Sequence, residues 1–406
     1  MKHSPLLDPS YGEQGVSRPD KRLFSINASI KSDSGRIAVG QARIADGWGY
    51  VVLRVDNAGN LDTGFGDGGL TIGRFKAGFN SAAAGVHIYD QHIIITGSYN
   101  DEATLSSMPA LARFDLDGKP DISFGDNGNK IIELPENPRP STALRSTDEV
   151  VTSSTLGEGG IFLSYQYPWS HGVIMKLDVN GEYDKRFNGT GYKFLKPPES
   201  TESSGRVRLI VDGRIYLTGA TNINGISGPY IACLKDTGEE EVTFGKGGYL
   251  LTELPSNLMF LDLAKLDNNG NFVCIGSVGT DEGFITAFTS SGEKLSGFKE
   301  GTTRFGGYGG QWTEGHVCTL TGKIIAIGTT LGADEADVVV GRFTLDGAPD
   351  TEFGDHQGWG RIALGGSIDV AMNSSLEEDG KTLIVGSDFE TGSQRQGFLL
   401  RCMTDS

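Results

Sequence analysis

The chain of 406 residues is poor in cysteine and has no long apolar run. Its cysteines stand singly inside short apolar stretches, without CxxC spacing, so neither a disulfide framework nor a zinc site is predicted. Buried free thiols suit a reducing compartment. No stretch approaches the roughly 18 apolar residues of a membrane helix, and MKHSPLLDPS at the N-terminus lacks the apolar core of a signal peptide. We expect no membrane span, and either a cytoplasmic location or export by a non-classical route. The four cysteines are Cys233, Cys274, Cys318 and Cys402.

Basic side chains are also scarce, with 35 Lys and Arg against 52 Asp and Glu and a net charge of −17. Nucleic-acid affinity depends on clustered Lys and Arg, so a nucleic-acid partner is not expected. The six histidines form no HxH or HExxH pair, and the chain contains no GxSxG or Walker sequence. These absences predict no catalytic residues, no metal site and no cofactor.

Sustained helical periodicity is missing, whereas glycine is abundant, at 60 residues. The glycines separate short apolar or alternating runs, a pattern typical of β-strands joined by tight turns. Most runs group into sets of four, and an all-β fold is therefore predicted.

A phrase containing an apolar strand, a glycine turn and an acidic-aromatic-glycine turn recurs along the chain, as in LRVDNAGNLDTGFGDGG from Leu53. Its aromatic residue returns at intervals between 54 residues (244 to 298) and 63 residues (124 to 187). Asp and Gly serve the turn itself, and the aromatic ring is expected to pack between neighbouring repeats. The copies carry Phe65, Phe124, Phe187, Phe244, Phe298 and Phe353, the fifth of them without the following glycine.

A second phrase, an apolar run that usually ends in glycine, has seven copies, such as GRIAVG at 35–40 and GKIIAIG at 322–328. Four strands in a unit of this length fit a propeller blade better than a β-helix coil or a helical repeat. Counting back from Phe65 leads to Tyr11 in LDPSYGEQG, whereas the last strand, GFLLRCM at 397–403, has no such turn after it. The N-terminal segment is therefore expected to complete the last blade.

The prediction is an all-β, seven-bladed β-propeller of four-stranded antiparallel blades, forming a single domain over residues 1–406. The blades are expected at 18–75, 76–135, 136–197, 198–254, 255–308, 309–365 and 366–406 plus 1–17.

The sequences LDTGFGDGG (61–69) and PDISFGDNG (120–128) resemble the bacterial delta-60 repeat family. The resemblance covers essentially the whole chain, although the third copy is written YDKRFNGTG and the fifth is degraded. It implies a repeated, propeller-like architecture and implies no catalytic residues.

The two sides of each blade differ in the sequence of their turns. The first-to-second and third-to-fourth strand turns are short and repetitive, which indicates a scaffold. The other connections vary in length and chemistry, as in QARIADGWG (41–49), QYPWSHG (166–172) and FGGYGGQWTEG (305–315). Loops without a structural duty commonly carry binding sites, so a ligand is expected on this variable loop face.

Aromatic residues with polar neighbours on this face could stack on a sugar or anchor a protein. The alternative is that they pack over the blade ends, and that the basic-aromatic run at 74–79 is a solvated loop. The candidate ligand-binding residues are Trp48, Arg74, Phe79, Tyr165, Tyr167, Trp169, His171 and Trp312.

Two acidic runs invite comparison with cation sites. Asp115, Asp117 and Asp121 lie beside glycine, but glycine falls at position four of a calcium loop rather than six, and position twelve is Asp126 rather than Glu. Asp334, Glu335 and Asp337 could attract a cation, but we favour an exposed acidic loop as the interpretation of this run. A turn is the simpler interpretation of the first run.

The function predicted from these patterns is non-catalytic binding of a protein or carbohydrate through the variable loop face, by a monomer. The alternative is a hydrolase acting on a sugar or lactone with isolated carboxylates near the propeller channel. A structural module within a larger assembly is a third possibility.

Overall fold

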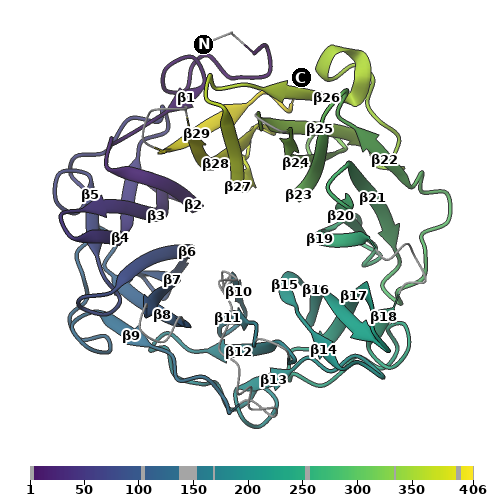
Figure 1. Cartoon of the computed structure of the whole chain (residues 1–406), viewed down its shortest axis with the longest axis horizontal. Helices are drawn as coiled ribbons and strands as arrows, with labels where there is room; N and C mark the ends of the chain where they lie inside the picture. Colours follow the sequence, from purple (N-terminus) through teal and green to yellow (C-terminus); the bar gives the residue numbers. More distant parts are fainter. Residues whose placement is uncertain are drawn as a thin grey trace. The chain divides into compact units, whose positions relative to one another are not determined.

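The computed structural model describes residues 4–101, 106–136, 153–167, 170–251, 257–332, 335–389 and 395–405. It is a seven-bladed β-propeller with four-stranded antiparallel blades, and the sheet of one blade has a short fifth strand (Figure 1). Among the described residues, the one helical segment is the short turn η1 (Gly354–Gly358). The predicted fold class is confirmed. The chain divides into two compact units, residues 18–196 with 200–207 (unit 2) and residues 1–17, 197–199 and 208–406 (unit 1).

Unit 2 contains the first three blades. Their strands are β2 (Leu23–Ser32), β3 (Gly35–Ile44), β4 (Gly47–Val55) and β5 (Leu70–Gly73); β6 (Asn80–Tyr89), β7 (His92–Asp101), β8 (Ser106–Phe114) and β9 (Asn129–Ile131); β10 (Ser153–Gly157), β11 (Gly160–Tyr165), β12 (Val173–Leu177) and β13 (Tyr192–Phe194). The short β14 (Glu202–Ser203) follows them.

Unit 1 contains the other four blades. Their strands are β15 (Arg206–Val211, in this unit from Arg208), β16 (Arg214–Ile223), β17 (Ile226–Lys235) and β18 (Tyr249–Leu251); β19 (Leu258–Lys265), β20 (Phe272–Val278), β21 (Glu282–Phe288) and β22 (Gly301–Arg304); β23 (Gly309–Cys318), β24 (Lys323–Leu331), β25 (Val338–Thr344) and β26 (Trp359–Ile362); β27 (Ile368–Leu376), β28 (Thr382–Phe389), β29 (Gln396–Cys402) and β1 (Val16–Ser17).

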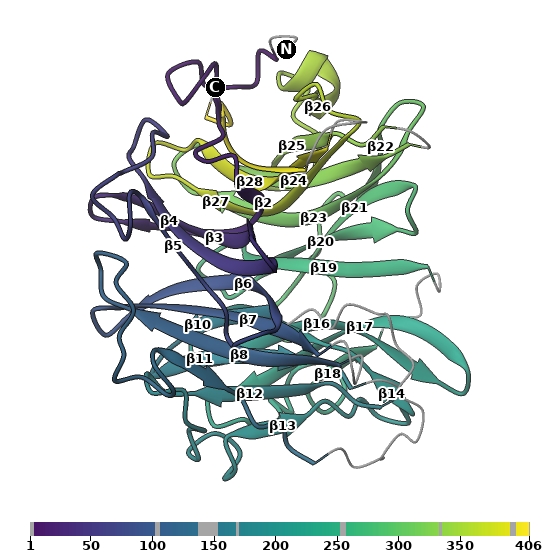
Figure 2. The same ribbon diagram turned by 60° about the vertical axis from the view of Figure 1, so that its left-hand side comes forward.

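The N-terminal segment completes the seventh blade, as the sequence predicts. Strand β1 pairs antiparallel with β29, with Val16 opposite Leu400, and Figures 1 and 2 both place the N-terminal segment beside the C-terminal strands. The Asp8 carboxylate accepts hydrogen bonds from Ser10 and from Arg401 Nε at 2.9 Å. Burial opposes ionisation of Asp8, but these bonds and the nearby Lys381 outweigh it and hold its pKa well below the usual value.

The repeated aromatic residue packs against the next blade, which confirms its predicted role. Phe65 is fully buried, and a Cβ added to Gly118 in the second blade would lie 2.4 Å from its ring. Arg54 places its guanidinium 5.1 Å from the centre of the same ring, donates to Asp62 at 2.7 Å, and donates to the Leu116 carbonyl of the next blade at 3.1 Å. The acidic-aromatic phrase is therefore a joint between blades.

A bulge interrupts the first strand of five blades at the same place, between Trp312 and Glu314 in the sixth, for example. The glycine that ends the second phrase lies opposite the bulge. A Cβ on Gly328 would lie 1.7 Å from the Gln311 carbonyl, and a Cβ on Gly276 would lie 1.8 Å from the Met259 carbonyl. No other residue type fits so close to the backbone. The recurring glycine therefore makes room for the bulge.

Candidate functional site

Three predicted residues of unit 2 gather where the second-to-third strand turn of the first blade meets the connection into β6. The Trp48 ring lies 4.6 Å from that of Phe24, and the Trp48 amide donates to Asn80 Oδ1 at 2.9 Å. Arg74 Nη2 donates to Asp46 Oδ1 at 2.8 Å. The tryptophan is half-buried, whereas the Asp46 side chain is 74% exposed. The Asn80 amide and the Asp46–Arg74 pair thus fix this connection against the turn.

Phe79 extends the same surface. Its ring meets the Tyr99 ring edge-to-face at 5.4 Å. The ammonium of the exposed Lys76 lies 4.5 Å from the Phe79 ring centre and 5.0 Å from that of Tyr99. A cation placed over aromatic rings is attracted to the negative faces of the rings, so this surface offers both aromatic faces and a positive charge. We call the set Phe24, Asp46, Trp48, Arg74, Lys76, Phe79, Asn80 and Tyr99 the aromatic-basic patch.

Trp48 lies in strand β4, so the prediction that it belongs to a nine-residue loop at 41–49 is wrong. Strands β3 and β4 continue until Ile44 pairs with Gly47, which leaves a two-residue turn. The turn-like composition of ADGWG conceals this hairpin, because Asp and Gly mark a turn without showing that the turn is only two residues long.

The other predicted aromatic group is largely internal. Tyr165 and Tyr167 are each 8% exposed and His171 is 6% exposed. The two tyrosine rings meet at 5.0 Å, Tyr167 donates to the Pro135 carbonyl, and His171 Nδ1 lies 3.1 Å from Ser203 Oγ. These contacts favour packing at the blade end, which is the alternative interpretation of the run. Trp169 lies outside the described residues.

The predicted placement of Trp312 in a surface loop is also wrong. Trp312 is fully buried in strand β23, with its ring 4.8 Å from that of Phe305. Glycines on neighbouring strands leave space for the indole. A Cβ added to Gly283 would lie 2.3 Å from the indole, and a Cβ added to Gly341 would lie 2.8 Å from it. The glycine-rich GGYGGQ before it imitates a long loop, but only its first residues, Gly306 and Gly307, form a turn, and strand β23 begins at Gly309.

The acidic runs have two different environments. Asp115 accepts the amides of Asp117 and Lys119 at 3.0 and 2.8 Å, so it closes a turn, as expected. Asp337, in contrast, is completely buried rather than exposed, and its Oδ2 lies 3.1 Å from Arg361 Nε. Burial raises the pKa of Asp337 against the opposing effect of Arg361. Asp334 lies outside the described residues.

A cluster of polar groups that the sequence did not predict lies beside the bulges on β19, β23 and β27, the first strands of three blades in unit 1. Asp262 Oδ2 accepts the Gly315 amide of the next blade at 2.9 Å. Glu314 accepts bonds from Asn373 Nδ2 at 3.0 Å and from Ser374. Burial, reinforced by the charge of Asp262, raises the pKa of Glu314 to about 7. The sequence signal for these positions was the glycine that ends each apolar run of the second phrase, because that glycine lies opposite the bulge.

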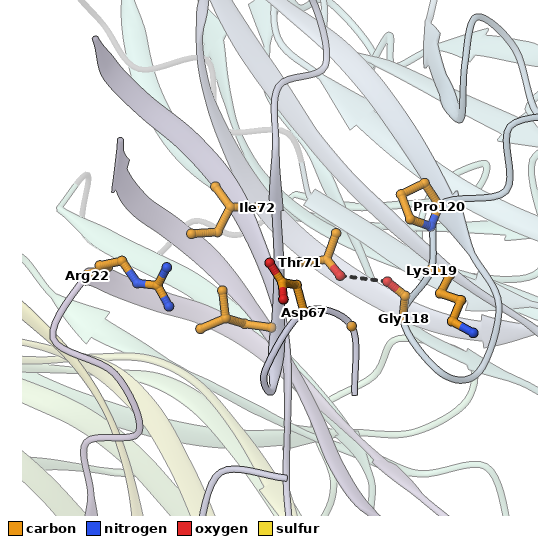
Figure 3. Close-up of a pocket in the computed structure, with 9 residues that line it drawn as sticks. Arg22, Asp67, Thr71, Ile72, Gly118, Lys119 and Pro120 are labelled. Carbon is orange, nitrogen blue, oxygen red and sulfur yellow. Dashed lines mark hydrogen bonds between the residues drawn. The ribbon is translucent and has the colours of Figure 1, made fainter. Parts of the chain in front are cut away.

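A pocket of about 390 Å³ lies beside strand β5 in unit 2 (Figure 3). It is bounded by Arg22, Asp67 and Lys119, and the Thr71 hydroxyl donates to the Gly118 carbonyl at 2.6 Å along its wall. Its lining belongs mainly to the repeated glycine turns, so it is part of the joint between blades and not of the variable loops. A smaller pocket of about 190 Å³ in unit 1 lies between the N-terminal segment and η1.

Within the described ranges, no group of three or more His, Cys, Asp or Glu side chains is arranged to hold a metal ion. No helix in the same part of the chain is long and apolar enough to cross a membrane.

The family described as "Domain of unknown function (DUF5122) beta-propeller" matches residues 212–239 and 321–353. This match supports a propeller repeat family. No curated protein matches the chain.

Several solved structures are similar to the chain. The β-propeller domain of the Trilobed protease from Pyrococcus furiosus is 10% identical, with 93% of each chain covered and a TM-score of 0.48. The GH43 endo-arabinanase from Bacillus licheniformis is 12% identical, with 71% of this chain and 96% of that chain covered and a TM-score of 0.33. Drosophila Semaphorin 1a, extracellular domains 1-2, is 8% identical, with 95% and 87% covered and a TM-score of 0.47. At these values the similarities carry no information about activity.

Proposed function

We propose that the protein is a non-catalytic binding propeller that recognises a protein or glycan partner through the aromatic-basic patch on its variable loop face. The observation that carries the proposal is the Lys76 ammonium over the Phe79 and Tyr99 rings, in the connection whose Asn80 side chain accepts the amide of the half-buried Trp48. Aromatic faces stack on the apolar faces of sugars or anchor protein partners, and fixed polar groups beside them set orientation.

The assignment to the delta-60 repeat family, a monomeric state and the compartment stay predictions. The delta-60 assignment is supported by the repeated phrase and by its role as a joint between blades. None of the three properties is needed for binding through the patch.

Binding to a glycan array and affinity capture from bacterial lysate test this proposal, with affinities then measured for each ligand found. We expect Trp48→Ala, Lys76→Ala and Phe79→Ala each to weaken binding about tenfold or more, the size of an interface hot spot. The matched control is Ile122→Ala, which removes a side chain that is 76% exposed on a glycine turn. If all three patch variants bind with wild-type affinity while keeping the wild-type melting temperature, the proposal is wrong.

The second candidate function is hydrolysis of a sugar or lactone. It is favoured by the carboxyl group of Glu314, whose pKa burial and Asp262 raise to about 7. A carboxylic acid beside a second carboxylate is the pair that glycosidases use. Against this, both carboxylates accept hydrogen bonds from neighbouring blades and so have a structural role.

Hydrolysis of aryl glycosides and lactones, measured for the wild type, Glu314→Gln and Asp262→Asn, separates the two candidates. Turnover that disappears in both variants, while glycan-array binding persists, would replace the binding proposal with the hydrolase. Absence of turnover, or equal rates in all three proteins, contradicts the hydrolase.

A further inference from the structure

The Ser374 hydroxyl on β27 lies between two titratable side chains of β23. Its Oγ is 2.8 Å from Glu314 Oε2 and 2.8 Å from His316 Nε2. A hydroxyl has one proton to donate, so Ser374 can donate to one of these neighbours and must accept from the other. Which way the proton points depends on the protonation of the two partners.

Glu314 is held by the seventh blade through both carboxylate oxygens. Asn373 Nδ2 donates to Oε1 at 3.0 Å, and the Ser374 amide donates to Oε2 at 2.5 Å. The charged groups that act on it are Asp262 on β19, which raises its pKa, and Arg208 on β15, which lowers it. Burial and Asp262 prevail, and the pKa of Glu314 is about 7. The carboxyl group therefore changes charge near neutral pH.

His316 keeps its neutral ring over the same pH range. Burial lowers the pKa of its imidazole to about 4, so above that value the ring carries a single proton, on either Nδ1 or Nε2. Only the Nε2–H form can donate to Ser374, and only the Nδ1–H form leaves Nε2 free to accept. The tautomer of His316 is therefore tied to the direction of the Ser374 hydroxyl.

We propose that Glu314, Ser374 and His316 form a proton-operated latch between the sixth and seventh blades. With Glu314 ionised, Ser374 donates to Glu314 and His316 Nε2–H donates to Ser374. When Glu314 takes a proton from water, its carboxyl donates to Ser374 Oγ. His316 gives its Nε2 proton to water and takes one at Nδ1, and the Ser374 hydroxyl then turns to donate to the deprotonated Nε2, so one proton is added in total.

The chain contains an internal comparison in unit 2. His87 Nε2 lies 2.8 Å from Ser154 Oγ, and Ser154 Oγ lies 2.6 Å from Thr96 Oγ1. Burial lowers the pKa of His87 to about 4 as well. The residue that follows the bulge is Gly85 here and Glu314 in the sixth blade. The His–Ser pair is thus repeated with glycine in place of the carboxylate, which makes His87 the control for His316.

The latch acts on the blade that the N-terminal segment completes. Strand β27 shares its sheet with β28, β29 and β1. Protonation of Glu314 exchanges a charge-assisted bond from the Ser374 hydroxyl for a neutral one, and charge-assisted bonds are the stronger kind. The contact between the sixth and seventh blades therefore changes with pH.

The test is nitrogen NMR of the full chain labelled with [15N]histidine, titrated from about pH 5.5 to 8.5, where both rings are neutral. The signals are assigned with His316→Gln and His87→Gln. We expect the His316 ring nitrogens to exchange their tautomer shifts with a midpoint near 7, while those of His87 stay constant. In Glu314→Gln, His316 should keep one tautomer throughout.

Wild-type protein alone decides the outcome if the Glu314→Gln variant fails to fold. A His316 ring that keeps one tautomer over the whole range overturns the latch. So does a change that persists in Glu314→Gln, or one of equal size at His87. Ser374→Ala provides a second check, because removing the hydroxyl should uncouple His316 from pH.

Discussion

Replacing Tyr11 by alanine probes the closure of the seventh blade without changing the length of the chain. Tyr11 is 2% exposed, and the Arg401 guanidinium of β29 lies 4.9 Å from its ring centre. Truncating a buried aromatic side chain costs about 3–5 kcal/mol of unfolding free energy. At roughly 2 °C per kcal/mol for a large domain, the melting temperature should fall by about 6–10 °C.

The matched control is Phe298→Ala, at the same position of the degraded fifth repeat. Phe298 is half-buried, so its removal should cost less, roughly 1–2 kcal/mol. Calorimetry gives the stability of each variant, and hydrogen exchange locates the effect. Amides of β29 should exchange faster in Tyr11→Ala and at the wild-type rate in Phe298→Ala. Melting of Tyr11→Ala within 1 °C of the wild type, with β29 protected as before, would show that Tyr11 does not hold the seventh blade closed.

Three further predictions concern side chains of unit 1. The raised pKa of Glu314 stabilises the folded protein fully at pH values below the pKa of the group in the unfolded chain, and this contribution is lost as pH rises through about 7. The unfolding free energy should therefore fall by roughly 2–3 kcal/mol from pH 5 to 8; a curve for Glu314→Gln that falls equally contradicts this. Gly283→Ala places a methyl group 2.3 Å from the indole of β23 and should cost about 1–3 kcal/mol, whereas Gly301→Ala, in open space, should leave the melting temperature unchanged. Arg361→Met leaves the buried Asp337 carboxylate without its ion pair and should lower the unfolding free energy by about 3 kcal/mol. The loss should be smaller at pH 5 than at pH 8, because the raised pKa of Asp337 favours the neutral acid. Equal losses at both pH values would be inconsistent with that cause.

The blade architecture was predictable because it rests on local patterns that recur. The aromatic residue after each glycine turn is buried, and the chain repeats this arrangement with Phe65, Phe124 and Phe187. The missing turn after β29 and the extra Tyr11 at the other end indicated closure. Both signals depend on residues close together in sequence, which is the range over which turn chemistry acts.

The candidate site was predictable only in part. Trp48, Arg74 and Phe79 do gather on one surface, but Trp312 is internal because glycines on two neighbouring strands make room for it. The burial of Trp312 depends on glycines about 30 residues away on either side, so the local run GGYGGQW gives no sign of it and looks like a loop. Glu314 was invisible for the same reason, since its partners lie about 60 residues away on β27.

Hydrogen exchange of the protein with and without a ligand found by the array or capture experiment shows whether the aromatic-basic patch is the binding site. We expect protection confined to the patch, in the segments 43–50, 73–80 and 98–101. Protection of the glycine turns, or of the first strands around Glu314 in unit 1, with the patch unchanged, would contradict it.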